Sequence, residues 1–135
     1  MNTIKTQIIA VNHESINKAA ALIKSGRLIA FPTETVYGLG ANALSGTAVA
    51  KIFEAKGRPQ FNPLITHFLS VSDVDEHAVM NEEAMKLAHY FWPGALTMIL
   101  PRKTDSDLSD LVSAGLPSVA CRVPAHKVAR ELIKA

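Results

Sequence analysis

The stretch KGRPQFNPLITH, residues 56–67, has a composition suited to holding an anion. Lys56 and Arg58 place two cations on either side of one glycine, and Pro59 restricts the chain immediately after them. An ammonium suits a single phosphate oxygen, whereas a guanidinium grips phosphate or carboxylate at two points. Asn62 adds an amide for a base or a sugar. A basic helix C-terminus would account for Lys56, but it would leave the prolines and Asn62 unexplained.

The stretch FPTETVYGLG forms a second polar constellation. The hydroxyls of Thr33, Thr35 and Tyr37 follow an apolar run, and loops at strand ends are where α/β sheets bind ligands. Gly38 and Gly40 would let the backbone approach such a ligand closely. An ordinary turn, in which the threonines bond to the local backbone, explains the same residues. Both interpretations stay open.

The stretch GLPSVACRVP forms a third constellation. Ser118 and Arg122 are four residues apart, so a strand would place both on one face. Arg122 lies among apolar residues, and a buried arginine needs an anionic partner. That partner is either a structural carboxylate of the protein or a carboxylate of a ligand.

Several other kinds of site are not indicated. The chain contains neither the dinucleotide pattern G-x-G-x-x-G nor the phosphate-loop pattern G-x-x-x-x-G-K-[ST]. Cys121 lies in an apolar run, so we interpret it as a packing residue. The remaining histidines show no metal-ligand spacing and are expected at the surface or at helix caps: His13, His77, His89 and His126.

The elements that must position these residues alternate between strands and helices. Strands are predicted at 6–11, 28–33, 63–69, 95–101 and 118–124, with the strand at 28–33 fully buried. Helices are predicted at 12–28, 45–58, 81–92 and 125–135, and a polar loop at 103–110. This order predicts the α/β class, with one twisted mixed sheet and helices packed on it.

Composition limits the remaining possibilities. The 135 residues fit one domain, and 48% apolar residues are enough for a core. A net charge of +2 is too small to indicate nucleic-acid binding by bulk charge. With one cysteine there is no internal disulfide, and the N-terminus lacks a signal-peptide pattern. We therefore expect a cytoplasmic protein with no membrane partner.

Four segments resemble, in the same order, the YrdC-like domain of threonylcarbamoyl-AMP synthases: FPTETVYGLG, KIFEAKGRPQFNPLITH, FWPGALTMIL and LPSVACRVPAH. The resemblance covers residues 16–134. It implies a single YrdC-like domain over 1–135, built as a twisted α/β sheet flanked by helices around a basic cavity. Because the family's domain continues further, the resemblance also implies that this chain is an N-terminal portion with the C-terminal part missing.

The resemblance implies a nucleotidyltransferase that makes threonylcarbamoyl-AMP and pyrophosphate from L-threonine, bicarbonate and ATP. A downstream threonylcarbamoyl-transferase complex then modifies adenosine next to the anticodon of tRNA, and direct tRNA binding by this domain is not expected. Magnesium is expected with the ATP phosphates, without a dedicated protein site and without an organic cofactor.

By matching position, the resemblance assigns two groups of residues. The threonine-binding residues are Thr33, Thr35, Tyr37, His67 and Arg122. The ATP-binding residues are Lys56, Arg58, Asn62 and Ser118, of which Lys56 and Arg58 are also the catalytic cations. Two alternatives stay open: a YrdC-like nucleotide- or RNA-binding module without synthase activity, and a carbamoyl-transfer domain of a larger protein.

Overall fold

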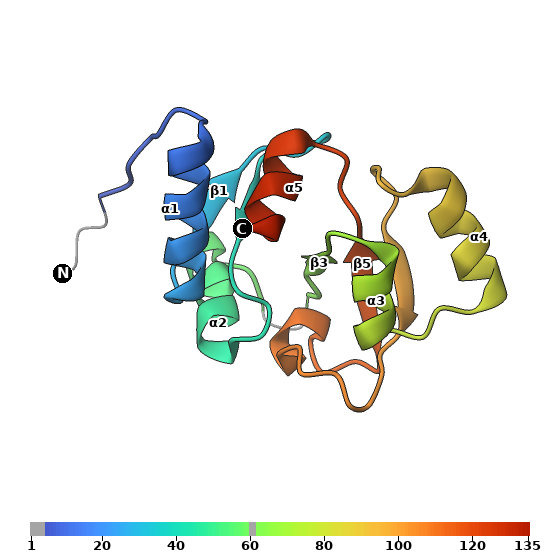
Figure 1. The fold of residues 1–135 in the computed structure, drawn as a ribbon. Helices are drawn as coiled ribbons and strands as arrows, with labels where there is room; N and C mark the ends of the chain where they lie inside the picture. The colour runs from blue at the N-terminus through green and yellow to red at the C-terminus, as the bar shows by residue number, and fades with distance from the viewer. Residues whose placement is uncertain (1–4, 60–61) are drawn as a thin grey trace.

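The computed structural model describes residues 5–59 and 62–135 (Figure 1). The helices are α1 (His13–Lys24), α2 (Gly46–Lys56), α3 (Val71–His77), α4 (Glu82–Phe91) and α5 (Lys127–Lys134), with a short 3-10 helix η1 (Asp110–Ser113). The strands are β1 (Ile29–Phe31), β2 (Gly38–Gly40), β3 (Ile65–His67), β4 (Met98–Pro101) and β5 (Ser118–Arg122). Among the described residues, no helix has both the length and the apolar character needed to cross a bilayer.

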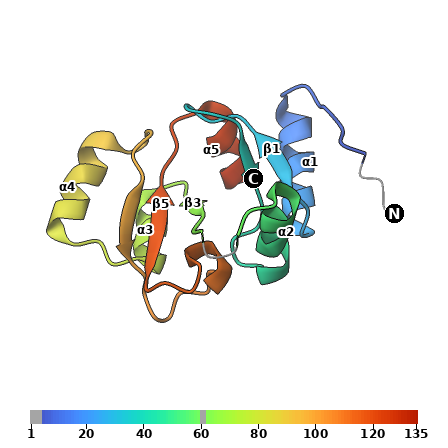
Figure 2. The same ribbon diagram turned by 180° about the vertical axis from the view of Figure 1, so that it is seen from behind.

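The strands are divided between two sheets. Strands β1 and β2 form an antiparallel pair, while β5 lies between β3, which is parallel to it, and β4, which is antiparallel. Seen from behind, α1, α2 and β1 lie on one side, α3, α4 and β5 on the other, and α5 between them (Figure 2). The α/β class is therefore confirmed, and the larger sheet is mixed as predicted, but two small sheets replace the single expected one.

One face of the three-stranded sheet carries the core. Burial alternates along β5, with Val119 and Cys121 buried and Ser118, Ala120 and Arg122 on the other, half-buried face. Ser118 and Arg122 thus share a face, as their spacing predicted. Complete burial raises the pKa of the Cys121 thiol to about 12, which confirms that this cysteine is a packing residue.

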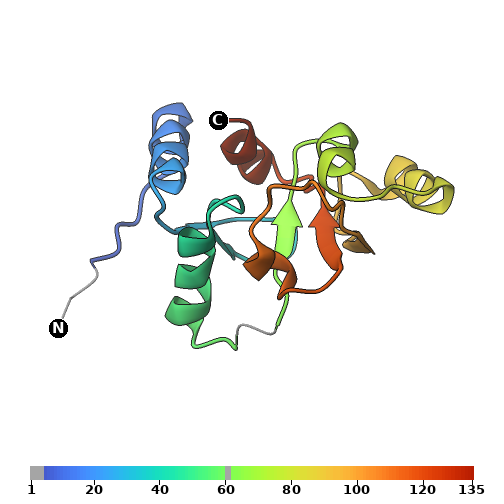
Figure 3. The same cartoon turned by 90° about the horizontal axis from the view of Figure 1, so that it is seen from below.

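Helices α2, α3 and α4 contribute side chains to the same buried core as β4 and β5. In Figure 3, α3 and α4 lie on one side of the molecule and α2 on the other. Val74 of α3, Ala84 and Ala88 of α4, and Val49 and Phe53 of α2 all belong to one buried cluster. The core therefore joins α2 to the three-stranded sheet. The opposite face of the sheet stays open, with Ile99 at 74% exposure, and leads toward the cavity described below.

The helix boundaries follow their caps. Side chains of Asn12, Ser45 and Asn81 accept hydrogen bonds from the first turns of α1, α2 and α4. His126 caps α5 in the same way, which confirms its expected capping role. These polar caps were readable in the sequence because a short acceptor side chain precedes an apolar helical repeat.

Two strand predictions need correction. Residues 6–11 form no strand, because they have no partner strand among the described residues and Ile8 is 99% exposed. The strand predicted at 28–33 is β1, but it is at most half-buried and Ala30 is exposed, since only β2 pairs with it. Patterning missed β2, α3 and η1, which are short and consist of glycine-rich or polar sequence.

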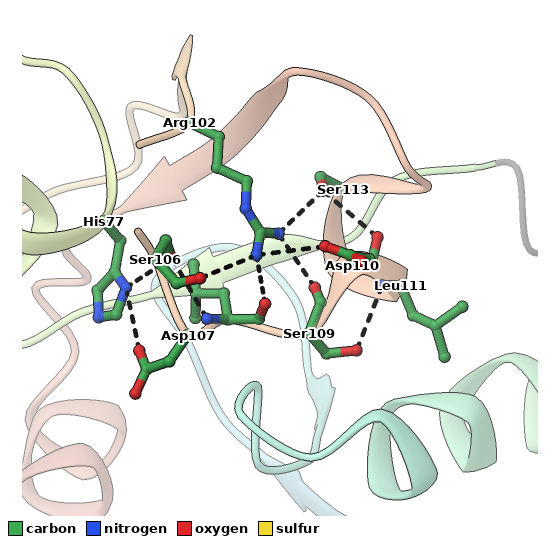
Figure 4. A network of polar contacts seen from close by, with 9 residues as sticks. His77, Arg102, Ser106, Asp107, Ser109, Asp110, Leu111 and Ser113 are labelled. Atoms are coloured by element: carbon green, nitrogen blue, oxygen red, sulfur yellow. Dashed lines mark hydrogen bonds and ion pairs between the residues drawn. The ribbon is translucent and has the colours of Figure 1, made fainter. Parts of the chain in front are cut away.

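The polar loop predicted at 103–110 is organised around one buried guanidinium (Figure 4). The Arg102 side chain is only 12% exposed and contacts the Asp110 carboxylate at 3.4 Å. It also donates hydrogen bonds to the Ser113 hydroxyl and to the carbonyls of Ser106, Leu108 and Ser109. The Arg102 guanidinium thus supplies hydrogen bonds to carbonyl groups of residues that lie outside the helices and strands.

We expect Arg102→Met to destabilise the fold by about 2–4 kcal/mol, because it leaves several part-buried acceptors without a hydrogen-bond donor. Urea unfolding measures this loss, with Lys86→Met, an exposed change on α4, as the matched control. Equal stability of the two variants would show that Arg102 does not hold the loop.

Candidate functional site

A cavity of about 620 Å³ lies between the two sheets. Its walls come from the β1–β2 loop, the end of α2, strands β3 and β5, and α5. None of its lining residues in the described chain is an aspartate or a glutamate. Four cationic side chains line it: Lys24, Lys56, Arg58 and Arg122. The volume is typical of a small-molecule site, and the basic character matches what the family resemblance implied.

Seven of the nine predicted site residues line this cavity: Thr33, Thr35, Tyr37, Lys56, Arg58, His67 and Arg122. Asn62 and Ser118, both within the described chain, are not among the lining residues. Ser118 lies at the opposite end of β5 from Arg122, paired with Pro101. The Asn62 N–H donates to the Pro59 carbonyl at 3.1 Å. The nucleotide-binding roles of these two residues stay predictions.

The two threonines make both kinds of contact considered from the sequence. The Thr33 hydroxyl donates to the Val36 carbonyl at 2.5 Å and accepts from the Thr35 N–H at 3.2 Å, which is a local turn. The hydroxyl of Thr33 has one proton, which it donates to the Val36 carbonyl. Thr35 must therefore be the donor in the 3.1 Å contact between the two hydroxyls. The lone pairs of Thr35 Oγ1 then face Arg122, whose Nη1 donates across 3.5 Å.

Arg122 is oriented by neutral partners. Its Nε donates to Thr97 Oγ1 at 3.0 Å, and its Nη1 reaches Thr35 as described. No ion pair joins Arg122 to a carboxylate within residues 5–59 and 62–135. A structural carboxylate is therefore not the partner among the described residues, and a ligand carboxylate is the hypothesis that fits this site.

Lys56 and Arg58 lie on either side of the point at which α2 ends. Gly57 adopts a left-handed conformation with φ 60°, and the Arg58 N–H bonds back to the Phe53 carbonyl at 2.9 Å. Lys56 thus occupies the last helical turn, as the helix-terminus interpretation expected, while Arg58 leaves the helix. Arg58 Nη2 donates to the Pro63 carbonyl at 2.8 Å, and its buried Nε has no partner among the described residues.

His67 presents a bare ring nitrogen. Its Nδ1 lies 3.3 Å from the Ile65 carbonyl, which can only accept, so Nδ1 carries the proton. Nε2 is then an unprotonated acceptor, buried and without a partner in the described chain. Burial is the largest effect on the pKa of His67 and lowers it; the bond to the Ile65 carbonyl opposes this, the Arg122 charge lowers the pKa further, and Glu34 raises it by the least. The ring is therefore neutral near pH 7.

The G-L-G sequence serves a packing role that patterning did not identify. A Cβ on Gly40 would lie 2.6 Å from Cε1 of Phe31, and one on Gly38 would lie 3.2 Å from its Cζ. The ring of Phe31 therefore fills the space expected for a ligand on that face. On its other side, the ring meets His67 edge-on, with centroids 6.1 Å apart.

Two further residues near the cavity were not singled out from the sequence. Thr97 orients Arg122, and the Glu34 carboxylate accepts the N–H groups of Ala125 and His126. Thr97 lies in FWPGALTMIL and Glu34 between Thr33 and Thr35, so both lie in segments that carried the resemblance. Their contacts are long-range in sequence and have no local signature.

A family model described as Telomere recombination, with the label Sua5_yciO_yrdC, matches residues 21–135. The chain belongs to the Sua5/YciO/YrdC family. A protein of Bacillus subtilis named threonylcarbamoyl-AMP synthase is 51% identical over 96% of this chain and 37% of its own length. One of Pyrococcus abyssi with the same name is 52% identical over 88% of this chain and 35% of its own length. The chain thus spans little more than a third of these relatives.

Solved structures show the same family likeness. Pyrococcus abyssi Sua5 in complex with L-threonine superposes with a TM-score of 0.87 at 49% identity, over 93% of this chain and 37% of that one. YciO of Escherichia coli, at 21% identity and a TM-score of 0.81, shows the fold alone. The YrdC-like fold implied by the sequence motifs is confirmed.

The pKa of His67 gives a pH-dependent stability in this Sua5/YciO/YrdC domain. Its folded pKa lies below the ordinary 6.5, so the unfolded chain binds more protons in that window. We expect stability to fall as pH drops through 6.5 toward the lowered pKa, and His67→Gln to flatten this fall. Urea unfolding at pH 7.5 and 5.5, with His89→Gln as control, measures it. Identical pH dependence in wild type and His67→Gln would contradict the assignment.

We expect Gly40→Ala to cost about 1–3 kcal/mol, since its Cβ drives the Phe31 ring off its position. Gly46→Ala is the matched control, because its Cβ meets only Ser109 Oγ at 3.4 Å, at the start of α2. Thermal unfolding of both variants makes the comparison. A Gly40→Ala protein as stable as Gly46→Ala would rule out the tight Phe31 contact.

Proposed function

We propose that this chain carries part of the active site of an L-threonylcarbamoyladenylate synthase, a nucleotidyltransferase. The observation that carries the proposal is that Arg122, hydrogen-bonded to Thr35, shares one cavity with three more cations and no acid from the described residues. The names of the 51% and 52% identical relatives support the same reaction. Its substrates are L-threonine, bicarbonate and ATP, and its products are threonylcarbamoyl-AMP and pyrophosphate.

Threonine binds at the Arg122 end of the cavity. The guanidinium, already positioned by Thr97 and Thr35, pairs with the threonine carboxylate. The bare Nε2 of His67 accepts an N–H of the amino or carbamate nitrogen. Thr33 and Tyr37 shape the same wall. Sua5 of Pyrococcus abyssi, solved with L-threonine, supports this ligand for the family fold.

ATP binds at the end of α2. Lys56 and Arg58, which line the cavity, hold the phosphates. For Asn62 and Ser118, which do not line it, the nucleotide contacts that the family resemblance implies stay predictions. A carbamate oxygen of N-carboxythreonine then attacks the α-phosphorus, and the bond from that phosphorus to the bridging oxygen of pyrophosphate breaks. Because both reactants are anions, the two cations reduce their repulsion and stabilise the charge that develops on pyrophosphate.

Magnesium arrives with the ATP phosphates in this proposal. In the described chain no group of three His, Cys, Asp or Glu side chains could hold a metal, so the residues present do not form a metal site of their own. The adenylate passes to a threonylcarbamoyl-transferase complex that modifies tRNA. We place these reactions in the cytoplasm, without direct tRNA binding by this domain.

Pyrophosphate release from ATP and bicarbonate, with and without L-threonine, tests the proposal. We expect threonine-dependent release that Arg58→Ala lowers about 10²- to 10³-fold, as for loss of one transition-state donor. Arg27→Ala, an exposed change that does not line the cavity, is the control.

Release with carbamoyl phosphate that does not need threonine would instead indicate the carbamoyl-transfer alternative. Salt-sensitive RNA binding without ATP consumption would indicate the nucleic-acid-binding module. A folded chain that binds neither threonine nor ATP would overturn the proposed function for this chain.

A further inference from the structure

Glu34 links two parts of the chain that are far apart in sequence. Its Oε2 accepts hydrogen bonds from the Ala125 N–H at 2.6 Å and the His126 N–H at 2.8 Å. Both bonds are short, and a carboxylate acceptor makes each of them charge-assisted. Glu34 itself is not among the residues that line the cavity, although its neighbours Thr33 and Thr35 are.

The two linked segments belong to different sheets. Glu34 lies in the loop that joins β1 to β2, whereas Ala125 and His126 lie between β5 and α5. The β1–β2 loop lines the cavity through Thr33 and Thr35, and the segment of Ala125 and His126 follows Arg122, which also lines it. Helix α5, which this segment enters, lies between the two sides of the molecule (Figure 1). A contact between the two segments therefore bears on how Thr35 and Arg122 lie relative to each other.

A second contact between the same segments is much weaker. Arg122 Nη1 and Thr35 Oγ1 are 3.5 Å apart, at the limit of a hydrogen bond. Thr35 directly follows Glu34, and Arg122 precedes Ala125 by three residues. The strong Glu34 contacts therefore lie beside the weak one, and a long contact between a guanidinium and a hydroxyl cannot by itself hold an exposed loop in place.

From this geometry we infer that Glu34 is a positioning residue, which fixes the Thr35 hydroxyl as an acceptor for Arg122 so that the oriented guanidinium can engage a ligand carboxylate. The threonine part of this inference rests on the proposed function. Glu34 acts through backbone N–H groups and does not touch the ligand. A positioning role predicts that its loss weakens threonine binding and leaves ATP binding at Lys56 and Arg58 intact.

A purely structural role is the competing explanation. The carboxylate binds the two N–H groups directly before α5, where a negative charge is favourable, while His126 itself caps the helix. Loss of this contact would lower overall stability, but it would weaken threonine and ATP binding equally. The ratio of the two affinities therefore separates positioning from a purely structural role.

Calorimetric titration of threonine and of ATP into the 135-residue chain makes this comparison. We expect Glu34→Ala to weaken threonine binding about 10- to 100-fold, as for a ligand group displaced by about 1 Å, with ATP affinity within about twofold. Glu34→Gln keeps an oxygen for the same N–H groups and should lose less than about fivefold. Glu54→Ala, an exposed change on α2, is the matched control.

A double-mutant cycle with Thr35→Ala tests the route of the effect. If Glu34 acts by placing Thr35, then Glu34→Ala should change threonine affinity less than about threefold in the Thr35→Ala background. Additive effects of the two substitutions, or equal losses for threonine and ATP, would overturn the inference.

Amide hydrogen exchange followed by NMR gives a measurement that needs no ligand. In Glu34→Gln and Glu34→Ala, we expect faster exchange at Ala125 and His126 and unchanged protection in β5. Unchanged exchange at Ala125 and His126 would overturn the inference whether or not threonine binds. Absence of threonine binding by a folded wild-type chain, with exchange altered as expected, would instead count against the proposed function alone.

Discussion

Four cations line one cavity whose lining residues in the described chain include no Asp or Glu side chain, and Lys24 donates to the Ala135 oxygen at 3.1 Å. Like charges repel one another, and a partly buried guanidinium that lacks a counter-ion costs free energy. In this domain neutral groups reduce that cost: threonine hydroxyls contact Arg122, and the Pro63 carbonyl contacts Arg58. Neutral acceptors orient Arg122 and Arg58, and neither forms an ion pair within the described residues, which is the basis for proposing an anionic ligand here.

Burial is the main reason that His67 is neutral, because it lowers the pKa of the imidazole. The charge of Arg122, its partner in the register of β3 and β5, lowers this pKa further. The ring stays neutral, and the Ile65 carbonyl selects which nitrogen keeps the proton. One end of the cavity thus combines a fixed cation with a bare acceptor, which matches an amino acid's carboxylate and nitrogen.

Much of this site was predictable because motifs report local chemistry. The cations flanking Gly57, the hydroxyls after β1 and the arginine on β5 were identified from residue type and spacing, and seven of the nine residues meet in one cavity. The pairing of strands was less predictable. Strand β2 is a glycine-rich triplet that makes room for Phe31, and residues 6–11 have β-branched sequence without a described partner. Glu34 was missed because its partners are 91 and 92 residues away.

Unsatisfied polar atoms give an independent indication of where function lies. In the described chain, the buried side-chain atoms without a hydrogen-bond partner are Glu34 Oε1, Arg58 Nε and His67 Nε2. Arg58 and His67 line the cavity, and Glu34 lies between two residues that do. By contrast, the guanidinium of Arg102, which does not line the cavity, is saturated with carbonyl and carboxylate partners. Folding stability favours satisfied polar groups, so the unpaired nitrogens of Arg58 and His67 are expected where a ligand completes their hydrogen bonds.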